Sequence, residues 1–364
     1  MADMQNYAAP PLLTHATAKR KRVSLNQLPT LPNAVLGAHD EGGGGDDKPV
    51  KKQHLLPAAK PEPNAAPAPA AAAAAASDDE EDPQLRKPYA SDIYSYLRST
   101  ESQATRRPAT DYIAAVQVDV TPNTRAILVD WLVDVSEEYR FVSDTLYLTV
   151  SYIDRFLSAN ALNRQKLQLL GVAAMLIASK HEEISPLNVE DFCYITDNTY
   201  TKQEVVKMES DILNVLKFEM GNPTPKTFLR MFTRFSKEDT KKVLAPYRSL
   251  QLEFLGSYLC ELSLLDYSML RFLPSLVAAS AVFVARLTLD PHTHPWSKKM
   301  QTLTGYEPSE LKDCVAAIHH LQLNRKYSSL MATRDKFKER KFKGVSALLP
   351  PVEIPASYFE KLKE

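Results

Sequence analysis

The chain has 364 residues, and its 44 Lys and Arg balance its 44 Asp and Glu, so the formal net charge is zero. This balance argues against a protein that binds nucleic acid over a broad surface, because such a protein carries a basic excess on one face. The three cysteines are far apart in apolar helical patterns, and no CxxC pair occurs, which indicates buried thiols in a reducing compartment. We therefore expect a soluble intracellular protein without a signal peptide, membrane span, metal or cofactor.

Residues 1–84 contain a single aromatic residue, clustered prolines, a Gly run, an Ala/Pro tract and an acidic block. Such a segment cannot bury enough apolar surface to offset the entropy of ordering it, so a disordered tail is predicted. Within the tail, Lys19, Arg20, Lys21 and Arg22 form a basic cluster typical of nuclear import, with a solvated charge run as the alternative. The predicted location is the nucleus, with some protein in the cytoplasm.

A short amphipathic helix is predicted at the start of residues 85–120, where Tyr89, Ile93 and Tyr96 recur at helical spacing. A polar, irregular link follows it. Few residues near this helix in the sequence could pack against it. It is therefore a candidate for docking on a partner as much as on its own domain.

The most apolar helix is predicted at 124–137, with Thr121 as its N-cap and Pro122 at its first position. Its apolar residues cover nearly the whole circumference, as in a helix inside a bundle. Arg125 is badly placed for the helix dipole, so it needs a carboxylate partner from another helix, and Asp154 on the next helix could supply it.

One face of this helix allows two interpretations. Ile127, Leu128 and Trp131 could all be core residues, which is the usual meaning of an apolar stripe. However, the other faces of the helix are also apolar and can fill the core by themselves. This face could therefore line a shallow exposed groove, and such a groove is a peptide site.

Five helices are predicted between residues 121 and 221, and the same pattern returns in 222–346. The segment LGVAAMLIASK at 170–180 aligns with LVAASAVFVAR at 276–286, and residues 151–153 align with 257–259 at the same offset. Two helices that match at one offset indicate a tandem repeat. Because no strand-like alternation of useful length occurs, the predicted fold is all-α, with two five-helix bundles and a C-terminal tail at 347–364.

The sequence shows no converging acid, base or nucleophile, so the chain is not expected to be an enzyme. His292 and His294 have no third ligand nearby, which favours an exposed loop over a metal pair. Lys180 and Glu209 are charges within apolar helices whose side chains could emerge at one edge of the bundle, a placement that suits a binding surface.

Four segments resemble the cyclin box of A-type cyclins: TRAILVDWL, YIDRFLS, LQLLGVAAMLIASKHEEI and DNTYTKQEVVKME. The resemblance covers residues 88–346 and the later GVSALLPP, and the short N-terminus with its KRKR cluster is most similar to the plant A3 group. It implies tandem cyclin boxes and a regulatory subunit that activates a cyclin-dependent Ser/Thr kinase. It also implies control of cell-cycle progression in S phase and G2/M.

The resemblance assigns roles to individual residues. The implied contacts with the PSTAIRE-type kinase are Lys180, Glu209, Glu182 and Glu183, with His181 where an aromatic residue is usual, and the helix carrying Tyr89, Ile93 and Tyr96 should add apolar area. The implied charged core is Arg125 and Asp154, next to Leu169. The implied docking patch for Arg-x-Leu segments of substrates and inhibitors is Ile127, Leu128, Trp131, Asp134 and Gln168, with Thr124 where the family has Met.

Arg22 and Leu25 resemble the ends of the destruction box of mitotic and S-phase cyclins, although the later Asn is absent. This resemblance implies that a ubiquitin ligase acting in mitosis recognises the element and that the proteasome then degrades the protein. The alternative is an ordinary tail without this role.

Two functions from other classes remain as alternatives. A general transcription factor with the same tandem helical fold binds DNA, but it should carry a basic stripe. An enzyme of unknown type would need converging catalytic groups. We therefore expect neither nucleic acid nor membrane as a partner.

Overall fold

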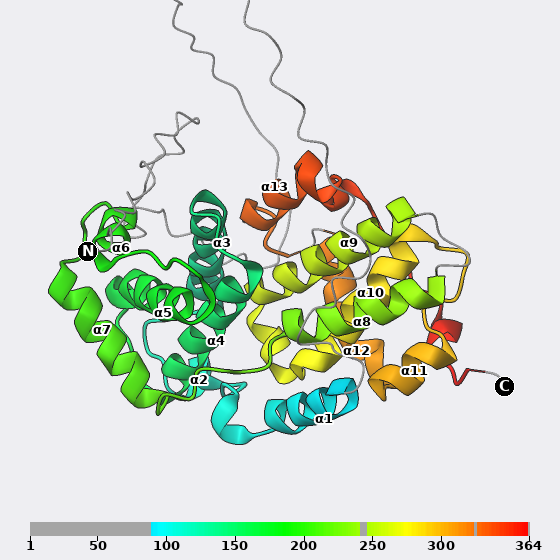
Figure 1. Ribbon diagram of the computed structural model, residues 1–364, viewed down its shortest axis with the longest axis horizontal. Helices are drawn as coiled ribbons and strands as arrows, with labels where there is room; N and C mark the ends of the chain where they lie inside the picture. Colours follow the sequence, from blue (N-terminus) through cyan, green and yellow to red (C-terminus); the bar gives the residue numbers. More distant parts are fainter. Residues whose placement is uncertain (1–88, 241–245, 324–325, 363–364) are drawn as a thin grey trace, which may run out of the picture. The chain divides into compact units, whose positions relative to one another are not determined.

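The computed structural model describes residues 89–240, 246–323 and 326–362. Every regular element in these ranges is a helix (Figure 1), which confirms the all-α prediction. The predicted disordered tail, the basic cluster at 19–22 and the Arg22–Leu25 element lie outside them. No helix in the described ranges is long and apolar enough to cross a membrane.

The first repeat consists of α3 (Pro122–Glu138), α4 (Ser143–Ala159), α5 (Leu167–Glu182), α6 (Val189–Ile195) and α7 (Lys202–Val215). Capping boxes open three of these helices, at Thr121, Asn188 and Thr201, and Thr121 is the N-cap that the sequence predicted. α4 begins at Ser143, and the side chain of its N-cap residue, Val142, makes no cap hydrogen bond. The sequence therefore locates helix starts well wherever the capping groups are local.

The cap of α4 comes from a residue distant in sequence. The Glu183 carboxylate accepts hydrogen bonds from the Val142 backbone N–H at 2.8 Å and from the Thr145 hydroxyl at 2.6 Å. An anion at a helix N-terminus is favourable both as an acceptor and for the dipole. The end of α5 is thereby tied to the start of α4.

The central helix of the first repeat is α5, in which every residue from Leu167 to Ser179 is buried. α4 and α7 pack along it, and α3 approaches it closely at Gly171. A Cβ atom at Gly171 would lie 2.9 Å from Leu128 Cδ1, so only glycine leaves room for the Leu128 side chain.

The second repeat consists of α8 (Pro225–Thr240), α9 (Pro246–Leu265), α10 (Pro274–Leu289), α11 (Lys298–Thr304) and α12 (Pro308–Gln322). α10, which the sequence aligned with α5, is likewise buried along most of its length and packs against α8, α9 and α12. The predicted tandem of helical bundles is thus present.

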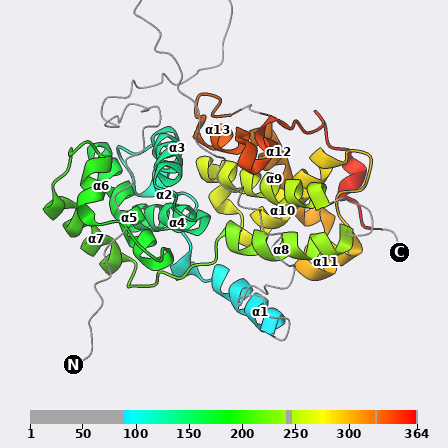
Figure 2. The ribbon, with the colours of Figure 1, turned by 45° about the horizontal axis from the view of Figure 1, so that its top comes forward.

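α1 (Ala90–Glu101) lies on the second repeat, below α8 and α11 in both views (Figures 1 and 2). The Tyr94 hydroxyl donates to the Thr304 carbonyl at 2.8 Å, and the Glu101 carboxylate accepts from the Ser275 backbone N–H at 2.9 Å. Arg98 adds hydrogen bonds to Ser275 and Tyr306. This face of α1 is therefore anchored on its own chain. The short α2 (Tyr112–Ala115) follows in the link to α3.

α13 (Ala332–Lys338) contacts both repeats. Its Ala332 backbone N–H donates to Asp130 Oδ1 on α3 at 3.0 Å, and Lys336 Nζ pairs with Glu261 on α9 at 2.8 Å and Glu137 on α3 at 3.1 Å. Residues 347–362 then return along the second repeat. There Phe359 stacks on Phe283 of α10, with ring centroids 5.4 Å apart.

Candidate functional site

Lys180 and Glu209 form an ion pair at one edge of the first repeat, with Lys180 Nζ 2.6 Å from Glu209 Oε1. Lys180 belongs to the last turn of α5, where a cation suits the helix dipole, and Glu209 lies in the middle of α7. The Lys180 side chain is 47% exposed and that of Glu209 is 14% exposed. The sequence placed both residues on one surface, but it did not indicate that they contact each other.

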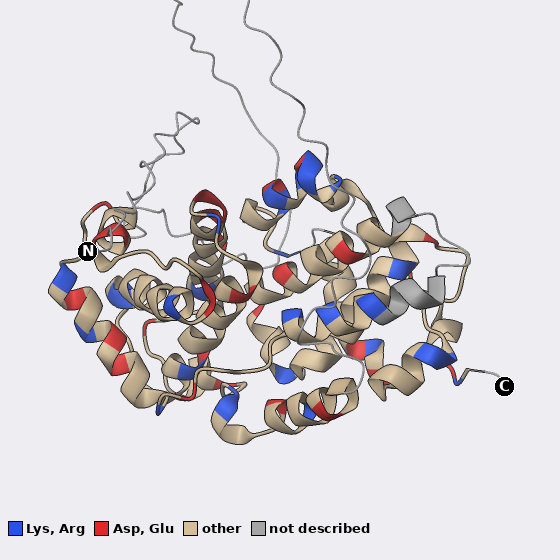
Figure 3. Ribbon diagram, viewed as in Figure 1, with Lys and Arg blue, Asp and Glu red and all other residues tan. Residues whose placement is uncertain are grey.

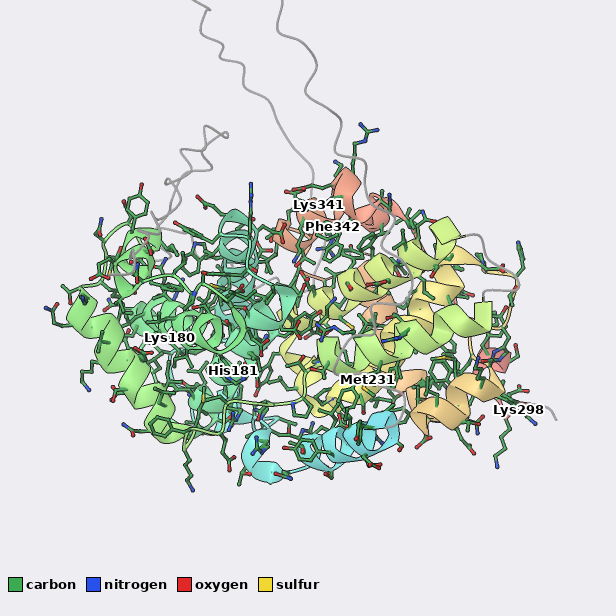
Figure 4. All side chains as sticks on the ribbon, in the orientation of Figure 1. Lys180, His181, Met231, Lys298, Lys341 and Phe342 are labelled. Atoms are coloured by element: carbon green, nitrogen blue, oxygen red, sulfur yellow. The ribbon has the colours of Figure 1, made fainter. Side chains whose placement is uncertain are left out.

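The three residues after Lys180 differ in their exposure and in what their side chains contact. His181 is exposed, as Figure 4 shows between α7 and α8, and its Nε2 lies 3.7 Å from Glu182. Burial and the nearby Asp144 carboxylate raise the pKa of Glu182. Glu183 behaves differently, because its carboxylate caps α4. Both hydrogen bonds use Oε1 of Glu183, and the implied contact between this carboxylate and a partner stays a prediction.

Two exposed apolar residues, one just after the end of α5 and one just after the end of α7, were not identified from the sequence. Ile184, directly after the Glu183 cap, is fully exposed, and Phe218, in the turn that follows α7, is 66% exposed. Phe218 has a positive φ of 57°, which is unusual for a bulky residue, and its backbone N–H donates to the Leu213 carbonyl at 3.0 Å. The periodicity of the fifth predicted helix gave no sign of this turn.

α1 carries an outward apolar stripe. Tyr89 and Tyr96 are exposed and Ile93 is partly exposed, at the spacing i, i+4 and i+7 of one helix side. Tyr94 faces the second repeat, where its ring contacts Phe228 and Phe232 edge to face. The structure thus leaves the three predicted contact residues on the side of α1 that its own chain does not use.

The predicted docking face of α3 is only partly available. Ile127, Trp131 and Asp134 are partly exposed, but Leu128 is 0% exposed and packs over Gly171 in the core. The prediction that Leu128 lines an exposed groove is therefore wrong. Leu128 follows Ile127 by one residue, which is a rotation of about 100° around the helix axis, and its side chain therefore points toward α5. Gln168, in the first turn of α5, is also buried.

Thr124 has a structural role at this end of α3. Its hydroxyl accepts from the Thr121 backbone N–H at 2.9 Å, and the Thr121 hydroxyl accepts from the Thr124 backbone N–H at 3.2 Å. The residue that replaces the family's Met is therefore half of a capping box.

The N-terminus of α13 borders the same side of α3, since the Ala332 backbone N–H donates to Asp130. Met331, directly before it, is exposed, and Asp335 lies one turn further along α13. On α3, Ile127, Asp130, Trp131 and Asp134 are partly exposed, and Asp335 is partly exposed on α13.

The predicted Arg125–Asp154 pair is confirmed. The Arg125 guanidinium donates to both Asp154 oxygens, at 2.6 Å and 2.7 Å, and the Tyr112 hydroxyl donates to the same carboxylate at 2.8 Å. Arg125 Nη1 also donates to the Leu264 carbonyl of α9 at 2.8 Å. Burial lowers the pKa of Arg125, but the adjacent carboxylate outweighs it and raises the pKa overall, so this pair stays charged.

The described ranges contain no group of His, Cys, Asp or Glu side chains that could hold a metal ion. In the view of Figure 3 both signs are mixed over the first repeat, whereas α8 carries a row of cations, formed by Lys226, Arg230 and Arg234 at a spacing of four residues.

Comparison with known proteins agrees with this architecture. Residues 92–221 match the family described as cyclin, N-terminal domain, and residues 223–351 match cyclin, C-terminal domain. Cyclin-A3-1 of Oryza sativa subsp. japonica is 67% identical over 378 residues, covering 100% of both chains, and Cyclin-A3-2 of the same organism is 64% identical, covering 95% of this chain and 89% of its own.

Among solved structures, a viral cyclin from herpesvirus saimiri shares the fold with a TM-score of 0.56 and 22% identity, covering 66% of this chain and 98% of its own. The resemblance to A-type cyclins is thereby confirmed. The chain belongs to the cyclin family and, within it, to the A3 group of A-type cyclins, which are non-catalytic regulatory subunits of protein kinases.

Proposed function

We propose that this cyclin binds and activates a PSTAIRE-type cyclin-dependent Ser/Thr kinase through the surface around Lys180 and Glu209. The observation that supports this best is the charged pair at the edge of an apolar bundle, with exposed Ile184 and Phe218 nearby in sequence. Large apolar residues that remain exposed beside specific polar groups are typical of a protein interface. The outer stripe of α1 would extend the apolar part of this surface.

The mechanism follows from what kinase activation needs. A regulatory subunit must hold a mobile kinase helix in the orientation in which the kinase's own Lys–Glu pair forms. Lys180 can donate to the carbonyls or carboxylates of that helix, and Glu209 can accept from backbone N–H groups. The pair already present in the free chain holds the two side chains close to the position that they would use.

The test is the double variant Lys180→Ala, Glu209→Ala in the full chain, with kinase affinity and histone phosphorylation as measurements. Loss of charge-assisted contacts at an interface costs about 2 to 5 kcal/mol, so affinity should fall by roughly 30-fold or more. The matched control is Lys202→Ala, Glu190→Ala, which removes an exposed pair of the same 2.6 Å distance. Wild-type activation by the Lys180/Glu209 variant would refute the proposal.

A role in G2/M is supported by a relative from Daucus carota, which is 56% identical over 278 residues and is named a G2/mitotic-specific cyclin, whereas the proposed role in S phase is supported by the sequence resemblance alone. Measurement of kinase activity co-purifying with this chain from synchronised cells tests the assignment. Activity confined to G1 would contradict it.

We also propose that Ile127, Trp131 and Asp134 bind Arg-x-Leu segments of substrates and inhibitors, with the buried Leu128 and Gln168 supporting them from the core. Asp134 would meet the peptide Arg, and the apolar side chains would meet its Leu. Trp131→Ala should weaken binding of such a peptide at least tenfold while leaving kinase binding unchanged. Unchanged peptide affinity in a folded variant would exclude this site.

For the N-terminal tail we propose nuclear import through Lys19, Arg20, Lys21 and Arg22, and ubiquitin-dependent turnover through Arg22 and Leu25. The support is the sequence alone. Leu25→Ala should lengthen the half-life of the protein in cells leaving mitosis without moving it out of the nucleus, whereas Lys19→Ala with Lys21→Ala should move it to the cytoplasm. Unchanged half-life or location would remove the respective role.

A further inference from the structure

We propose that Ser185 is a phosphorylation site for a proline-directed Ser/Thr kinase, and that the phosphate weakens binding of a partner at the surface around Lys180 and Glu209. Ser185 is followed by Pro186 in the segment that joins α5 to α6. The effect on binding rests on the proposed function of that surface, whereas the modification itself does not.

In three places of the sequence a serine or threonine directly precedes a proline, and the hydroxyl groups of these residues differ in their contacts. The Thr121 hydroxyl accepts from the Thr124 backbone N–H at 3.2 Å at the start of α3. The Thr224 hydroxyl accepts from the Thr227 backbone N–H at 3.3 Å at the start of α8, and Thr224 is 4% exposed. Ser185 is exposed, and within the residues that the structure describes no hydrogen bond involves its hydroxyl. Of the three, Ser185 therefore presents the hydroxyl that an enzyme can reach.

The backbone around Ser185 suits a kinase active site. Residues 183–188 lie outside both helices, and residues 184–186 are all exposed. A proline favours an extended backbone at the residue before it, and a kinase binds its substrate peptide in an extended conformation. Pro186 also lacks a backbone N–H, which is the feature that a proline-directed kinase selects directly after the phosphorylated residue. A kinase can thus reach Ser185 without unwinding the middle of α5 or α6.

The neighbouring residues narrow the class of kinase. Glu182 and Glu183 precede Ser185, and Asn188 is the third residue after it, so the segment carries no cation on either side of the hydroxyl within three residues. The modifying kinase must therefore recognise the proline without needing a nearby Lys or Arg. In the reaction, the Ser185 hydroxyl oxygen bonds to the γ-phosphorus of ATP, the bond from this phosphorus to the bridging oxygen breaks and ADP leaves, and the hydroxyl proton passes to the carboxylate base of the kinase.

The surroundings of Ser185 are already rich in negative charge. Burial and the carboxylates of Asp144 and Glu183 raise the pKa of Glu182. The two cations near Glu182 face carboxylates of their own, since His181 Nε2 lies 3.7 Å from Glu182 and Arg230 is paired with Asp144 at 2.6 Å. A phosphate on Ser185 would have to compete with these carboxylates for a cation.

A phosphate is therefore unfavourable at this end of α5. It adds a charge of about −1.5 to −2 close to the C-terminus of the helix, which the helix dipole already makes negative. Ile184, next to Ser185, is fully exposed, so a partner that covers Ile184 would also have to remove water from the phosphate. We expect phosphorylation to act on the free chain, because a bound partner covers the hydroxyl.

The modification is tested on the free full-length chain with ATP and a purified mitogen-activated protein kinase, followed by mass spectrometry. Phosphate should appear on Ser185 in the wild type. Pro186→Ala keeps the hydroxyl but removes the proline, and it should slow this reaction by roughly tenfold or more. Absence of phosphate from Ser185, or an equal rate in Pro186→Ala, would overturn the proposal.

A binding measurement tests the consequence. Fully phosphorylated chain should bind the cyclin-dependent kinase about tenfold more weakly than the unmodified chain, and Ser185→Ala treated in the same way should bind normally. Ser185→Glu should also weaken binding, whereas Ser357→Glu, which adds a charge at an exposed serine of the C-terminal segment, should not.

The outcomes separate this inference from the proposed function. Unchanged binding by the phosphorylated chain, together with lost binding by the Lys180/Glu209 double variant, overturns the blocking role and leaves the proposed function intact. Weakened binding by the phosphorylated chain, together with normal binding by the double variant, supports the role of Ser185 and refutes the proposed function of the charged pair.

Discussion

Arg125 and Asp154 form a two-point ion pair inside the first repeat, and Arg125 also reaches the Leu264 carbonyl of the second. Both side chains are almost fully buried. A buried pair with satisfied hydrogen bonds adds little net free energy, but removal of one partner leaves an uncompensated charge. The pair therefore fixes the relative position of α3, α4 and α9 more than it contributes to the total stability.

From this relationship we expect Arg125→Leu or Asp154→Leu alone to lower the free energy of unfolding by about 3 to 5 kcal/mol. The double variant should lose clearly less than the sum of the two, because no unpaired charge remains. Urea denaturation followed by circular dichroism measures all three values. Strict additivity would show that the two side chains do not depend on each other.

Gly171→Ala tests the close approach of α3 to α5. The added Cβ would meet Leu128 Cδ1 at 2.9 Å, and Leu128 has no exposed surface into which it could move. We expect a loss of about 1 to 3 kcal/mol in the free energy of unfolding. Gly221→Ala is the matched control, since nothing lies within 4 Å of its added Cβ, and it should stay within about 0.5 kcal/mol. Equal stability of the two variants would mean that α3 shifts freely.

Glu137 of α3 binds α13 through an ion pair with Lys336, and the strength of this pair depends on pH. Burial raises the pKa of Glu137, but Lys336 and Lys341 outweigh this effect and lower it below 4.5. A depressed carboxyl pKa stabilises the folded state above the unfolded pKa, and this stabilisation is lost as the pH falls through the folded pKa. At pH 7, Glu137→Gln should therefore lower the free energy of unfolding by about 1 to 2 kcal/mol.

The difference between wild type and Glu137→Gln should shrink below pH 4.5, where the wild-type carboxyl becomes protonated. Burial and, to a smaller extent, the nearby Glu137 carboxylate raise the pKa of Glu261, so Glu137→Gln also changes the titration of Glu261. Urea titrations at pH 7, 5 and 3.5 give the values. A difference that is constant over this range would contradict the assigned ion pairs.

Thr124→Met should have two opposite effects. Loss of the Thr124 hydroxyl removes half of the capping box of α3, which should lower the free energy of unfolding by about 0.5 to 1 kcal/mol. The added thioether should tighten binding of an Arg-x-Leu peptide about fivefold, which corresponds to about 1 kcal/mol. Thr124→Ser, which keeps the hydroxyl, serves as the control for stability. Peptide affinity that does not change with the Met would show that position 124 lies outside the peptide site.

The predictions that succeeded depend on local signals or on repetition. Thr121 and Thr201 begin helices because their capping partners lie three residues away, and α10 matches α5 because both are central helices of equivalent bundles. The pairing of Arg125 with Asp154 followed from the need of a buried cation for a carboxylate.

The prediction that failed, and the contacts that the sequence did not indicate, depend on packing between distant segments. Leu128 was assigned to an exposed groove because the sequence shows which residues of α3 are apolar but not which side α5 covers. Glu183 caps a helix that begins some forty residues earlier, and the Ala332 backbone N–H of α13 donates to Asp130 of α3, which lies 202 residues earlier in the chain. No pattern within a single helix encodes these contacts.

The C-terminal segment covers part of the second repeat, close to the position that the repeat aligns with Lys180. In the second repeat, Phe359 stacks on Phe283, which lies three residues before Arg286, the position that the repeat aligns with Lys180. His319 and Gln322 of α12 bind the backbone of the same segment at Pro351 and Leu348. The second repeat thus covers part of this region with its own chain. If the kinase binds at the proposed surface around Lys180, we expect a stoichiometry of one kinase per cyclin.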